Sequence, residues 1–473
     1  MIEMENFSFI HGNYHQQSFA AELVVTHKFN GDVIGRIQQA DEKALETAIA
    51  SAHTAFKELQ QWSPAQRIEC MEKLIALMLV HKDHLAETIC MEAGKPLFYA
   101  QQEVLRCIET IRAGIRETGN AMGEIVPMYD GQKLAFTKRF AYGPVLGITP
   151  FNFPLNLALH KIIPALAVGT SIVIKAAPQA PLSLLKLASL IHQAGAPVGA
   201  VNVLVCDLTL AEKLVRDNRF PVLSFTGSDR VGWYLKSIAG KKRVLLELGG
   251  NAPVIVDETA NLDQAAAKIA YGAFLYAGQI CISTQKIYVA QKVADTFTEL
   301  LLAETESIKS GDPAHLDTIN GPLIDAKALE NAMNKLSEAK RAGAELLCGG
   351  FLINPESRIL APSLLSGVHP ETSLQKDEVF APIAILETVR NTEQAIKLAN
   401  SSRFGLQCGV FCNDTELFKR AFDELQYGAV LLNSAPGFRV DHMPYGGIKD
   451  SGTGREGVRY TMLEYTESKL AVL

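Results

Sequence analysis

The sequence predicts an α/β protein with two lobes and a small β element. Between residues 143 and 228, continuous apolar segments alternate with helical ones, the pattern of βαβ units in a parallel sheet covered on both faces. A second α/β series begins after Gly250. Residues 123–141 alternate between polar and apolar, and residues 451–473 are glycine-rich and then end in a strand candidate. We expect these two separated pieces to form the β element.

The first lobe is expected to begin with helices. Residues 36–119 are rich in Ala, Leu, Glu, Lys and Gln at helical spacing. The strands that follow are expected at 143–149, 171–175, 201–205 and 221–225, and the helices between them at 155–168, 183–195 and 209–217.

The second lobe continues the same alternation. Its strands are expected at 252–257, 286–290 and 383–387, and its helices at 262–276, 293–309 and 392–400. A last strand is expected at 468–473. These elements divide the chain into three domains, assigned as 1–122 with 142–246, then 247–450, and then 123–141 with 451–473.

Composition favours an ordinary globular protein. Of 473 residues, 48% are hydrophobic and 20% charged, and the net charge of −6 with no basic stripe argues against nucleic-acid binding. The eight cysteines form neither a CxxC pair nor a Cys/His cluster, so a reducing compartment is favoured and no metal site is expected. The N-terminus lacks the features of a secretory signal, and prolines and charged residues interrupt the most apolar stretch, 145–174. A cytoplasmic protein without a membrane span is expected.

Cys281 is the strongest candidate for a catalytic residue. It stands in a turn of small residues, Gly278–Ser283, and Glu247 precedes a second glycine-rich turn 34 residues upstream. A thiol and a carboxylate presented on two such turns suggest a nucleophile with a general base. Alternatively, Cys281 is a small buried hydrophobe and Glu247 a surface residue beside a hinge.

Asn152 lies in a loop that two prolines, Pro150 and Pro154, make rigid. The loop follows an expected strand, and ligands bind at the carboxyl ends of strands in α/β sheets. The amide of Asn152 is therefore a candidate donor to a developing oxyanion. Taken alone, the residue is better interpreted as a structural asparagine that satisfies the loop backbone.

Three further segments are candidates for a nucleotide site. Lys175 ends a strand from which it can reach ribose hydroxyls or a phosphate, or point to solvent. Residues 225–232 read as strand, turn and helix start, but their glycines do not match the GxGxxG fingerprint. Glu378 lies near Phe380 in a charged loop that either grips a ribose or only packs an aromatic ring.

Six motifs follow one another along the chain: Pro150–Pro154, Phe225–Ser228, Glu247–Gly250, Gly278–Cys281, Glu378–Pro382 and Pro444–Gly452. In this order they resemble the NAD(P)-dependent aldehyde dehydrogenase superfamily, in style closest to its lactaldehyde and non-phosphorylating glyceraldehyde-3-phosphate dehydrogenase branches. The resemblance implies an α/β fold with a Rossmann-type cofactor domain, an α/β catalytic domain and a small β flap for oligomerisation, usually into a homodimer or homotetramer.

The resemblance also implies a mechanism with a small aldehyde as substrate. Cys281 attacks the aldehyde carbon as a thiolate and forms a thiohemiacetal, while the Asn152 amide and the Cys281 backbone N–H stabilise the oxyanion. Hydride transfer to the nicotinamide leaves a thioester, and Glu247 is the general base for the hydrolytic water. The cofactor contacts implied are Ile148, Thr149, Pro150, Phe151, Lys175, Pro178, Phe225, Gly227, Ser228, Val231, Leu248, Gly249, Glu378 and Phe380.

Pro178 departs from the pattern of many NAD-preferring relatives, which carry a glutamate there. A carboxylate at this position binds ribose hydroxyls and repels a 2′-phosphate. Without it NADP is possible, but no basic residue adjoins Pro178 to favour it. NAD is therefore the expected cofactor.

Arg439 and His160 are the candidate substrate contacts. Arg439 lies shortly before the Pro444–Gly452 motif, as in the lactaldehyde and glyceraldehyde-3-phosphate branches, and can pair with an anionic substrate or simply with Asp441. Semialdehyde-specific relatives often have arginine where this chain has His160, which weakens a succinate-semialdehyde assignment. A small hydroxyaldehyde or a modest aliphatic aldehyde is expected.

Two other functions stay open. A CoA-acylating dehydrogenase passes the thioester to CoA and needs no general base, so the presence of Glu247 favours hydrolysis. A non-catalytic NAD-binding relative needs none of the residues Cys281, Glu247 and Asn152, and their presence together argues against it.

Overall fold

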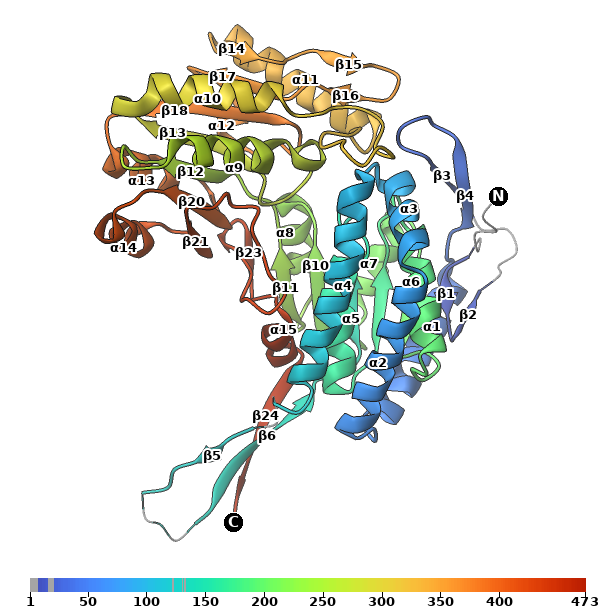
Figure 1. Ribbon diagram of the computed structural model, residues 1–473. Coiled ribbons are helices and arrows are strands. Elements are labelled where there is room, and N and C mark those ends of the chain that lie inside the picture. The colour runs from blue at the N-terminus through green and yellow to red at the C-terminus, as the bar shows by residue number, and fades with distance from the viewer. Residues whose placement is uncertain (1–6, 16–20, 121–122, 130, 132) are drawn as a thin grey trace.

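Two mainly parallel sheets form the centres of two lobes, and a narrow β ribbon projects from one end (Figure 1). The computed structural model describes residues 7–15, 21–120, 123–129, 131 and 133–473. The predicted fold class, α/β with two lobes and a small β element, is confirmed. The first six residues, on which the expectation about a signal rests, lie outside the described residues.

The sheet of the first lobe has eight strands in the order β2-β1-β9-β8-β7-β10-β11-β23, and the five from β9 to β11 run parallel. Its strands are β1 (Phe9–Ile10), β2 (Asn13–Tyr14), β7 (Val145–Ile148), β8 (Ile172–Lys175), β9 (Val201–Leu204), β10 (Val222–Thr226), β11 (Arg243–Glu247) and β23 (Gly452–Thr453). A separate hairpin joins β3 (Glu22–Thr26) to β4 (Val33–Gln38). The central strands β7, β8 and β9 are buried along their whole length, as strands covered on both faces must be.

Eight helices accompany this sheet: α1 (Glu42–Leu59), α2 (Pro64–Val80), α3 (Lys82–Ala93), α4 (Leu97–Glu117), α5 (Asn156–Val168), α6 (Leu182–Gln193), α7 (Leu208–Arg216) and α8 (Asp229–Ile238). Local sequence sets several of their ends. Ser63 forms a capping box with Gln66 ahead of Pro64 at the start of α2, and Gly169 ends α5 in a left-handed conformation. Helix α5 is buried almost throughout, because α4 packs against it on the side away from the sheet.

The second lobe is built on a seven-stranded sheet in the order β14-β17-β18-β13-β12-β20-β21, in which only β14 is antiparallel to its neighbour. Its strands are β12 (Ala252–Val256), β13 (Thr284–Ala290), β14 (Glu345–Cys348), β17 (Ser363–Ser366), β18 (Ile383–Val389), β20 (Gln407–Phe411) and β21 (Ala429–Leu432). The helices are α9 (Leu262–Phe274), η1 (Leu275–Gly278), η2 (Gln291–Val293), α10 (Ala294–Glu306), α11 (Ala326–Arg341), α12 (Ser373–Lys376), α13 (Thr392–Asn400) and α14 (Thr415–Glu424). A short hairpin pairs β15 (Leu352–Asn354) with β16 (Ile359–Leu360), and a separate two-stranded sheet pairs β19 (Phe404–Gly405) with β22 (Ile448–Lys449).

The ribbon consists of β5 (Ile125–Val126), β6 (Ala135–Ala141) and β24 (Thr466–Val472), with β24 paired along the full length of β6. Residues 451–465 do not belong to it. Strand β23 joins the first sheet beside β11, and α15 (Val458–Glu464) packs on α5 and α4 by burying Val458 and Met462. The ribbon therefore takes only the last strand from the range 451–473, and the division of the chain into domains stays a prediction.

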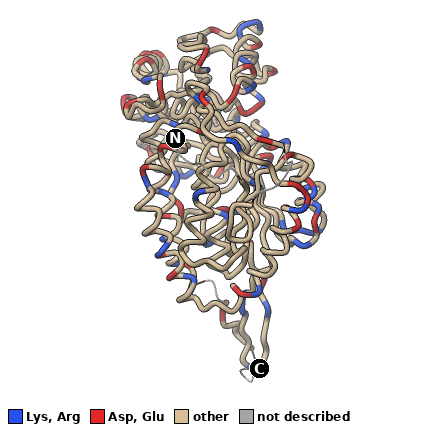
Figure 2. Tube along the Cα trace, turned by 90° about the vertical axis from the view of Figure 1, so that its right-hand side faces the viewer, with Lys and Arg blue, Asp and Glu red and all other residues tan. Residues whose placement is uncertain are grey.

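Charged residues of both signs are interspersed over both lobes in the view of Figure 2. Among the described residues, no helix is long and apolar enough to cross a membrane.

Candidate active site

One cavity of about 610 Å³ lies at the carboxyl ends of the first-lobe strands, where the second lobe covers them. It is lined by Cys281, Glu247 and Asn152, and also by all fourteen residues expected to contact the cofactor. The three candidate catalytic groups come from different parts of the fold: the loop after β7, the end of β11 and the turn before β13. The structure therefore brings the thiol, the carboxylate and the amide to a single space.

Asn152 is held with its amide directed toward the turn that carries Cys281. Its Nδ2 donates a hydrogen bond to the carbonyl of Gln279 at 2.9 Å, and its Oδ1 is buried without a partner. The same loop is fixed from behind, because Glu103 accepts hydrogen bonds from the backbone N–H groups of Leu155 and Asn156 at 3.0 Å. This arrangement holds an amide donor against the turn that carries the thiol, in the cavity that both residues line.

The turn that presents Cys281 has an unusual backbone. Tyr276, Ala277 and Gly278 have φ angles of 52°, 55° and 65°. Two non-glycine residues, Tyr276 and Ala277, therefore have the left-handed backbone conformation that normally favours glycine. Gln279, which is fully buried, stabilises the turn by accepting from the N–H of Ile324 at 2.9 Å. Strained backbone that its surroundings hold in place is a feature of functional turns.

The thiol of Cys281 is largely protonated at rest. Burial raises its pKa to about 12, and the hydrogen bond with Tyr445 opposes that rise. The Oη atom of Tyr445 lies 3.1 Å from Sγ, and the ring is covered by the Arg439 guanidinium at 3.8 Å. Tyr445 is remote in sequence, and motif reasoning did not single it out as a partner of the thiol.

The Tyr445 hydroxyl is expected to stabilise the thiolate, since its own pKa is raised well above the ordinary value by burial and it stays a donor. For Tyr445→Phe we expect alkylation of Cys281 by iodoacetamide at pH 8 to slow about 10-fold, the size of one hydrogen bond to a charged group. Tyr427→Phe is the matched control, because the Tyr427 hydroxyl bonds the Ala399 carbonyl instead. Equal alkylation rates in the two variants would show that Tyr445 only packs against the thiol.

Glu247 ends β11 and is 6% exposed. Its Oε2 is buried without a hydrogen-bond partner. Burial, and then repulsion from Glu456, raise the pKa of Glu247 well above its usual value, although Arg439 and Lys161 oppose the shift. A carboxyl whose pKa is raised in this way is suited to take a proton near neutral pH.

Glu378 and Gly249 form the part of the cavity expected to hold the nicotinamide ribose. Glu378 accepts a hydrogen bond from the N–H of Gly250 at 3.1 Å, and burial raises its pKa to about 8. A Cβ atom at Gly249 would lie 2.4 Å from Oε2 of Glu378. Phe380, with a φ of 53°, sets its ring edge-on to Phe151 at 5.9 Å. The missing side chain at 249 thus leaves a cradle beside a carboxylate, which fits a dinucleotide.

Gly249→Ala is expected to raise the dissociation constant of the cofactor about 10-fold while leaving the melting temperature nearly unchanged. The new methyl group displaces only the flexible end of Glu378, so it moves a ribose contact without breaking the core. Gly311→Ala serves as the control, since a Cβ there meets no atom within 4 Å. Titration of each variant by quenching of protein fluorescence measures the effect, and equal affinities would remove Gly249 from the cofactor site.

The remaining cofactor candidates fit a phosphate and a second ribose. Lys175 is 8% exposed at the end of β8, and no hydrogen bond or ion pair of its ammonium is found among the described residues. Ser228 is the residue before α8, whose free backbone N–H groups can receive a pyrophosphate. Gly232 in α8 allows close packing, because a Cβ there would lie 2.3 Å from the Leu248 side chain.

Nine further residues line the cavity that the sequence did not single out: Leu157, Ala177, Gln179, Leu208, Ala211, Glu212, Thr226, Tyr234 and Leu235. Most come from α7 and α8 and surround the end of the cavity beside Pro178. Helices α7 and α8 look like ordinary amphipathic helices in the sequence, so nothing in them predicts a binding site. The one local feature that could have indicated it is a glutamate on α7 and a tyrosine on α8, the facing helix. Tyr234 donates to Glu212 at 2.9 Å across this wall.

His160 and Arg439 do not line the cavity. Arg439 donates to Glu456 at 2.8 Å and not to Asp441, which instead binds His160 and Arg106, each at 2.9 Å. The His160 side chain is fully buried, and burial lowers its pKa. A direct contact of either residue with the substrate stays a prediction.

Among the described residues, no group of three or more His, Cys, Asp or Glu side chains is placed to hold a metal ion. The site consists of a thiol, a buried carboxyl and an amide that line one cavity together with the residues expected to contact a dinucleotide. Fold and site together define a thiol-dependent dehydrogenase.

Comparisons with known proteins agree with this class. The aldehyde dehydrogenase family model matches residues 15–471. A 3-sulfolactaldehyde dehydrogenase of Priestia aryabhattai is 36% identical over 462 residues, which is 97% of this chain and 96% of that protein. A lactaldehyde dehydrogenase of Methanococcus maripaludis is 35% identical, covering 93% of this chain and 94% of that protein. The solved structure of glyceraldehyde-3-phosphate dehydrogenase GapN from Methanocaldococcus jannaschii, complexed with NADP, superposes with a TM-score of 0.92 at 33% identity over 97% of this chain and 100% of that one.

The chain belongs to the aldehyde dehydrogenase family. It is an oxidoreductase that converts an aldehyde to a carboxylic acid with NAD or NADP. The predicted class of enzyme and its cofactor type are thereby confirmed.

Proposed function

We propose that the protein oxidises a small 2-hydroxyaldehyde to the corresponding 2-hydroxy acid through a covalent intermediate on Cys281. The single observation that carries the mechanism is that Cys281, Glu247 and Asn152 line one cavity together with the cofactor residues. The substrate class is supported by the relatives, because lactaldehyde, sulfolactaldehyde and glyceraldehyde 3-phosphate all carry a hydroxyl group next to the aldehyde carbon.

Each residue has a distinct role in this proposal. The Cys281 thiolate attacks the aldehyde carbon, and the Asn152 amide and the Cys281 backbone N–H hold the resulting oxyanion. When bound beside these residues, NAD(P) would supply the hydride acceptor. Glu247 then takes a proton from the water that attacks the thioester. The Cys281 proton has to leave before the thiolate attacks the aldehyde, and Glu247, which lines the same cavity, can help to receive it without being the required acceptor.

Hydrolysis is favoured over transfer to CoA. A water molecule needs a base near the thioester, and Glu247 provides a buried carboxyl whose second oxygen has no partner. Transfer to CoA needs no such group, so the formation of acyl-CoA by the enzyme would overturn this part of the proposal.

Both cofactors are compatible with the cavity, with NAD as the expected one. Pro178 offers no carboxylate to repel a 2′-phosphate, and Lys175 is a nearby cation without a partner among the described residues. Glu212 also faces this end of the cavity, bonded to Tyr234. Its negative charge disfavours a 2′-phosphate and supports NAD.

The expected setting is a cytoplasmic homodimer or homotetramer. The ribbon β5–β6–β24 exposes the apolar side chains of Ile125, Leu470 and Val472, and apolar side chains gathered on a projecting element mark a surface that another chain can cover. We propose that a second copy of the chain covers these side chains, and that the domains follow the ranges given above, with 451–465 added to the first.

A panel of short aldehydes assayed with both cofactors tests the substrate class. We expect kcat/KM for lactaldehyde or glyceraldehyde 3-phosphate to exceed that for propanal by about 10-fold or more, because a site built to bond a hydroxyl discriminates against its absence. Succinate semialdehyde is the comparison for an acid without the hydroxyl. Equal values for propanal and lactaldehyde would contradict the proposed class while leaving aldehyde oxidation intact.

A further inference from the structure

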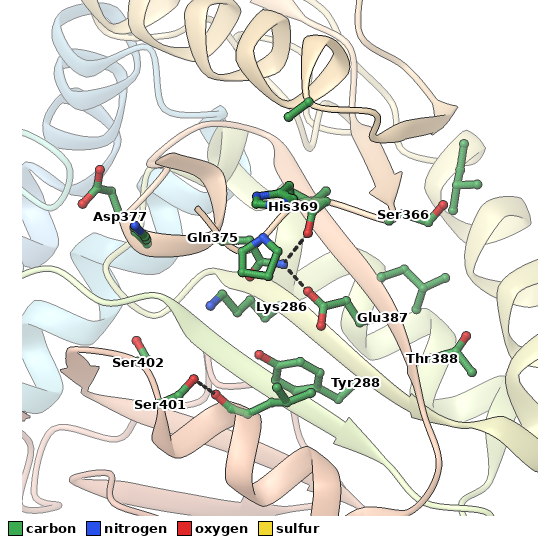
Figure 3. A pocket seen from close by; sticks show the side chains of 18 of the residues that line it. Lys286, Tyr288, Ser366, His369, Gln375, Asp377, Glu387, Thr388, Ser401 and Ser402 are labelled. Carbon is green, nitrogen blue, oxygen red and sulfur yellow. Dashed lines mark hydrogen bonds between the residues drawn. The ribbon is translucent and has the colours of Figure 1, made fainter. Parts of the chain in front are cut away.

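A second and larger cavity, of about 1070 Å³, lies in the second lobe and shares no lining residue with the first. Its floor is formed by β13 and β18, and its walls by α12, by the loop after β17 and by the end of α13. Figure 3 shows the side chains that surround it. Nothing in the oxidation of an aldehyde uses this space.

Two polar side chains of β13 end in this cavity without a partner. Lys286 is 6% exposed and Tyr288 is 2% exposed, and the two residues lie on the same face of the strand because they are two positions apart. Among the described residues, no hydrogen bond or ion pair is found for either side chain. In Figure 3 the Lys286 nitrogen and the Tyr288 oxygen both point toward the space between Gln375 and Ser402.

An ammonium group buried in this way is costly to the fold unless an anion or water satisfies it. Burial lowers the pKa of Lys286, and the carboxylate of Glu387 opposes that shift. Glu387 does not form an ion pair with it, however, and instead accepts a hydrogen bond from the amide of Gln375. The ammonium of Lys286 is therefore not neutralised by an ion pair with Glu387.

The other cations that line the cavity are already paired. Lys376 bonds Glu371. Arg403 makes ion pairs with three carboxylates, those of Asp229, Asp377 and Asp450. Lys286 thus differs from Lys376 and Arg403, because its ammonium has no carboxylate partner among the described residues and can bind an anionic ligand.

His369 adds a donor at the rim. It is exposed, and its Nδ1 accepts a hydrogen bond from the N–H of Glu371 at 3.2 Å, so its other ring nitrogen carries the proton in the neutral form. Three donors of different kinds, an ammonium, a phenol and an imidazole, therefore line one space over the sheet.

We propose that this cavity is a second binding site, for the carboxylate or phosphate group of a small metabolite. The anionic oxygens bind the Lys286 ammonium and the Tyr288 hydroxyl, which form charge-assisted hydrogen bonds with them. Gln375 offers its unspent Oε1 to a hydroxyl of the same ligand, since both of its amide hydrogens are used by Glu387 and by the Val368 carbonyl.

The site adjoins elements that also serve the active site. Strand β13 begins three residues after Cys281, and α12 ends two residues before Glu378. Asn251, beside the glycine pair at 249–250, donates to the carbonyl of Asp377 at 3.0 Å. The proposed ligand thus contacts structure that continues directly into the nucleophile turn and the ribose contact.

Calorimetric titration of the full-length enzyme with inorganic phosphate and with malonate tests the proposal, and saturating NAD keeps the dinucleotide cavity filled. We expect one site per chain with a dissociation constant in the millimolar range or below for at least one of the two anions. Lys286→Met is expected to weaken binding by at least 10-fold, and Tyr288→Phe by a smaller factor. Lys292→Met, at an exposed lysine paired with Glu258, is the matched control and should bind like the unmodified enzyme.

Two results would overturn the proposal: no saturable binding of either anion by the unmodified enzyme, or binding that Lys286→Met and Lys292→Met weaken equally. If Lys286→Met does not fold, Tyr288→Phe decides, because it keeps the ring and removes only the hydroxyl. Unchanged anion affinity in that variant then counts against the site. Affinity for NAD measured in parallel shows that the first cavity is intact.

Discussion

Cys281→Ala is expected to lower kcat by about 10⁴-fold or more, because the reaction loses the atom to which the substrate becomes attached. The variant should still bind NAD with nearly the same affinity. Cys281 contributes one partly buried sulfur to a cavity whose cofactor residues are held independently by β7, β8, β10 and β11. Steady-state rates and a fluorescence titration with NAD measure the two effects separately.

The control for this prediction is Cys348→Ala. Cys348 is a free cysteine in β14, also partly buried, and it lines neither cavity. We expect it to keep full activity. A Cys281→Ala enzyme that retained a tenth of the activity would mean that the carbonyl is not attacked by sulfur, and the family mechanism would not apply to this chain.

Short motifs could indicate the residues that line the first cavity, because the chemistry or the space at each of these positions requires a particular residue type. A glycine at 249 is required by the approach of Glu378, and a lysine at 175 ends a strand at the edge where ligands bind. Such requirements can be recognised in short stretches of sequence. The alternation of buried strands and helices likewise predicted both parallel sheets, because strands covered on both faces are apolar without interruption.

Other features leave no local mark. The left-handed backbone at Tyr276 and Ala277 is imposed by the surrounding packing, and neither residue type predicts this conformation. Helix α15 was expected as part of the ribbon, because glycines precede it and only its packing on α5 and α4 makes it a helix. The contact of Tyr445 with Cys281 joins residues 164 positions apart, a distance that no short motif spans.

The pairing of Arg439 shows the same limit for charges. Sequence proximity suggested Asp441 as the alternative partner to a substrate, but the guanidinium binds Glu456, and Asp441 reaches His160 and Arg106. Several charges buried together can pair in more than one way, and only the fold selects one. Arg439 does not line the cavity, but it acts on two residues that lie close to the thiol or the cofactor. Its guanidinium packs on the ring of Tyr445, and its positive charge opposes the rise in the pKa of Glu247.

Glu247→Gln is expected to separate the two halves of the reaction. Attack by Cys281 and hydride transfer survive, so rapid mixing should show a burst of reduced cofactor close to one equivalent per active site. The turnover that follows should be slower by about 10²–10⁴-fold, the usual contribution of a general base. In the unmodified enzyme, the rate of hydrolysis should rise with pH and then level off, because only the ionised carboxylate takes a proton and burial has raised its pKa.

The pH profile distinguishes this role from a structural one. Glutamine cannot ionise, so hydrolysis in the variant depends on hydroxide alone and should keep rising where the unmodified enzyme has levelled off. Glu92→Gln controls for the loss of a buried carboxyl, since burial also raises the pKa of Glu92, to about 7, but its oxygens accept hydrogen bonds at the start of α6. It should keep both the burst and the plateau. If Glu247→Gln lost the burst as completely as the turnover, the carboxyl would act before the thioester forms, as the base that deprotonates Cys281.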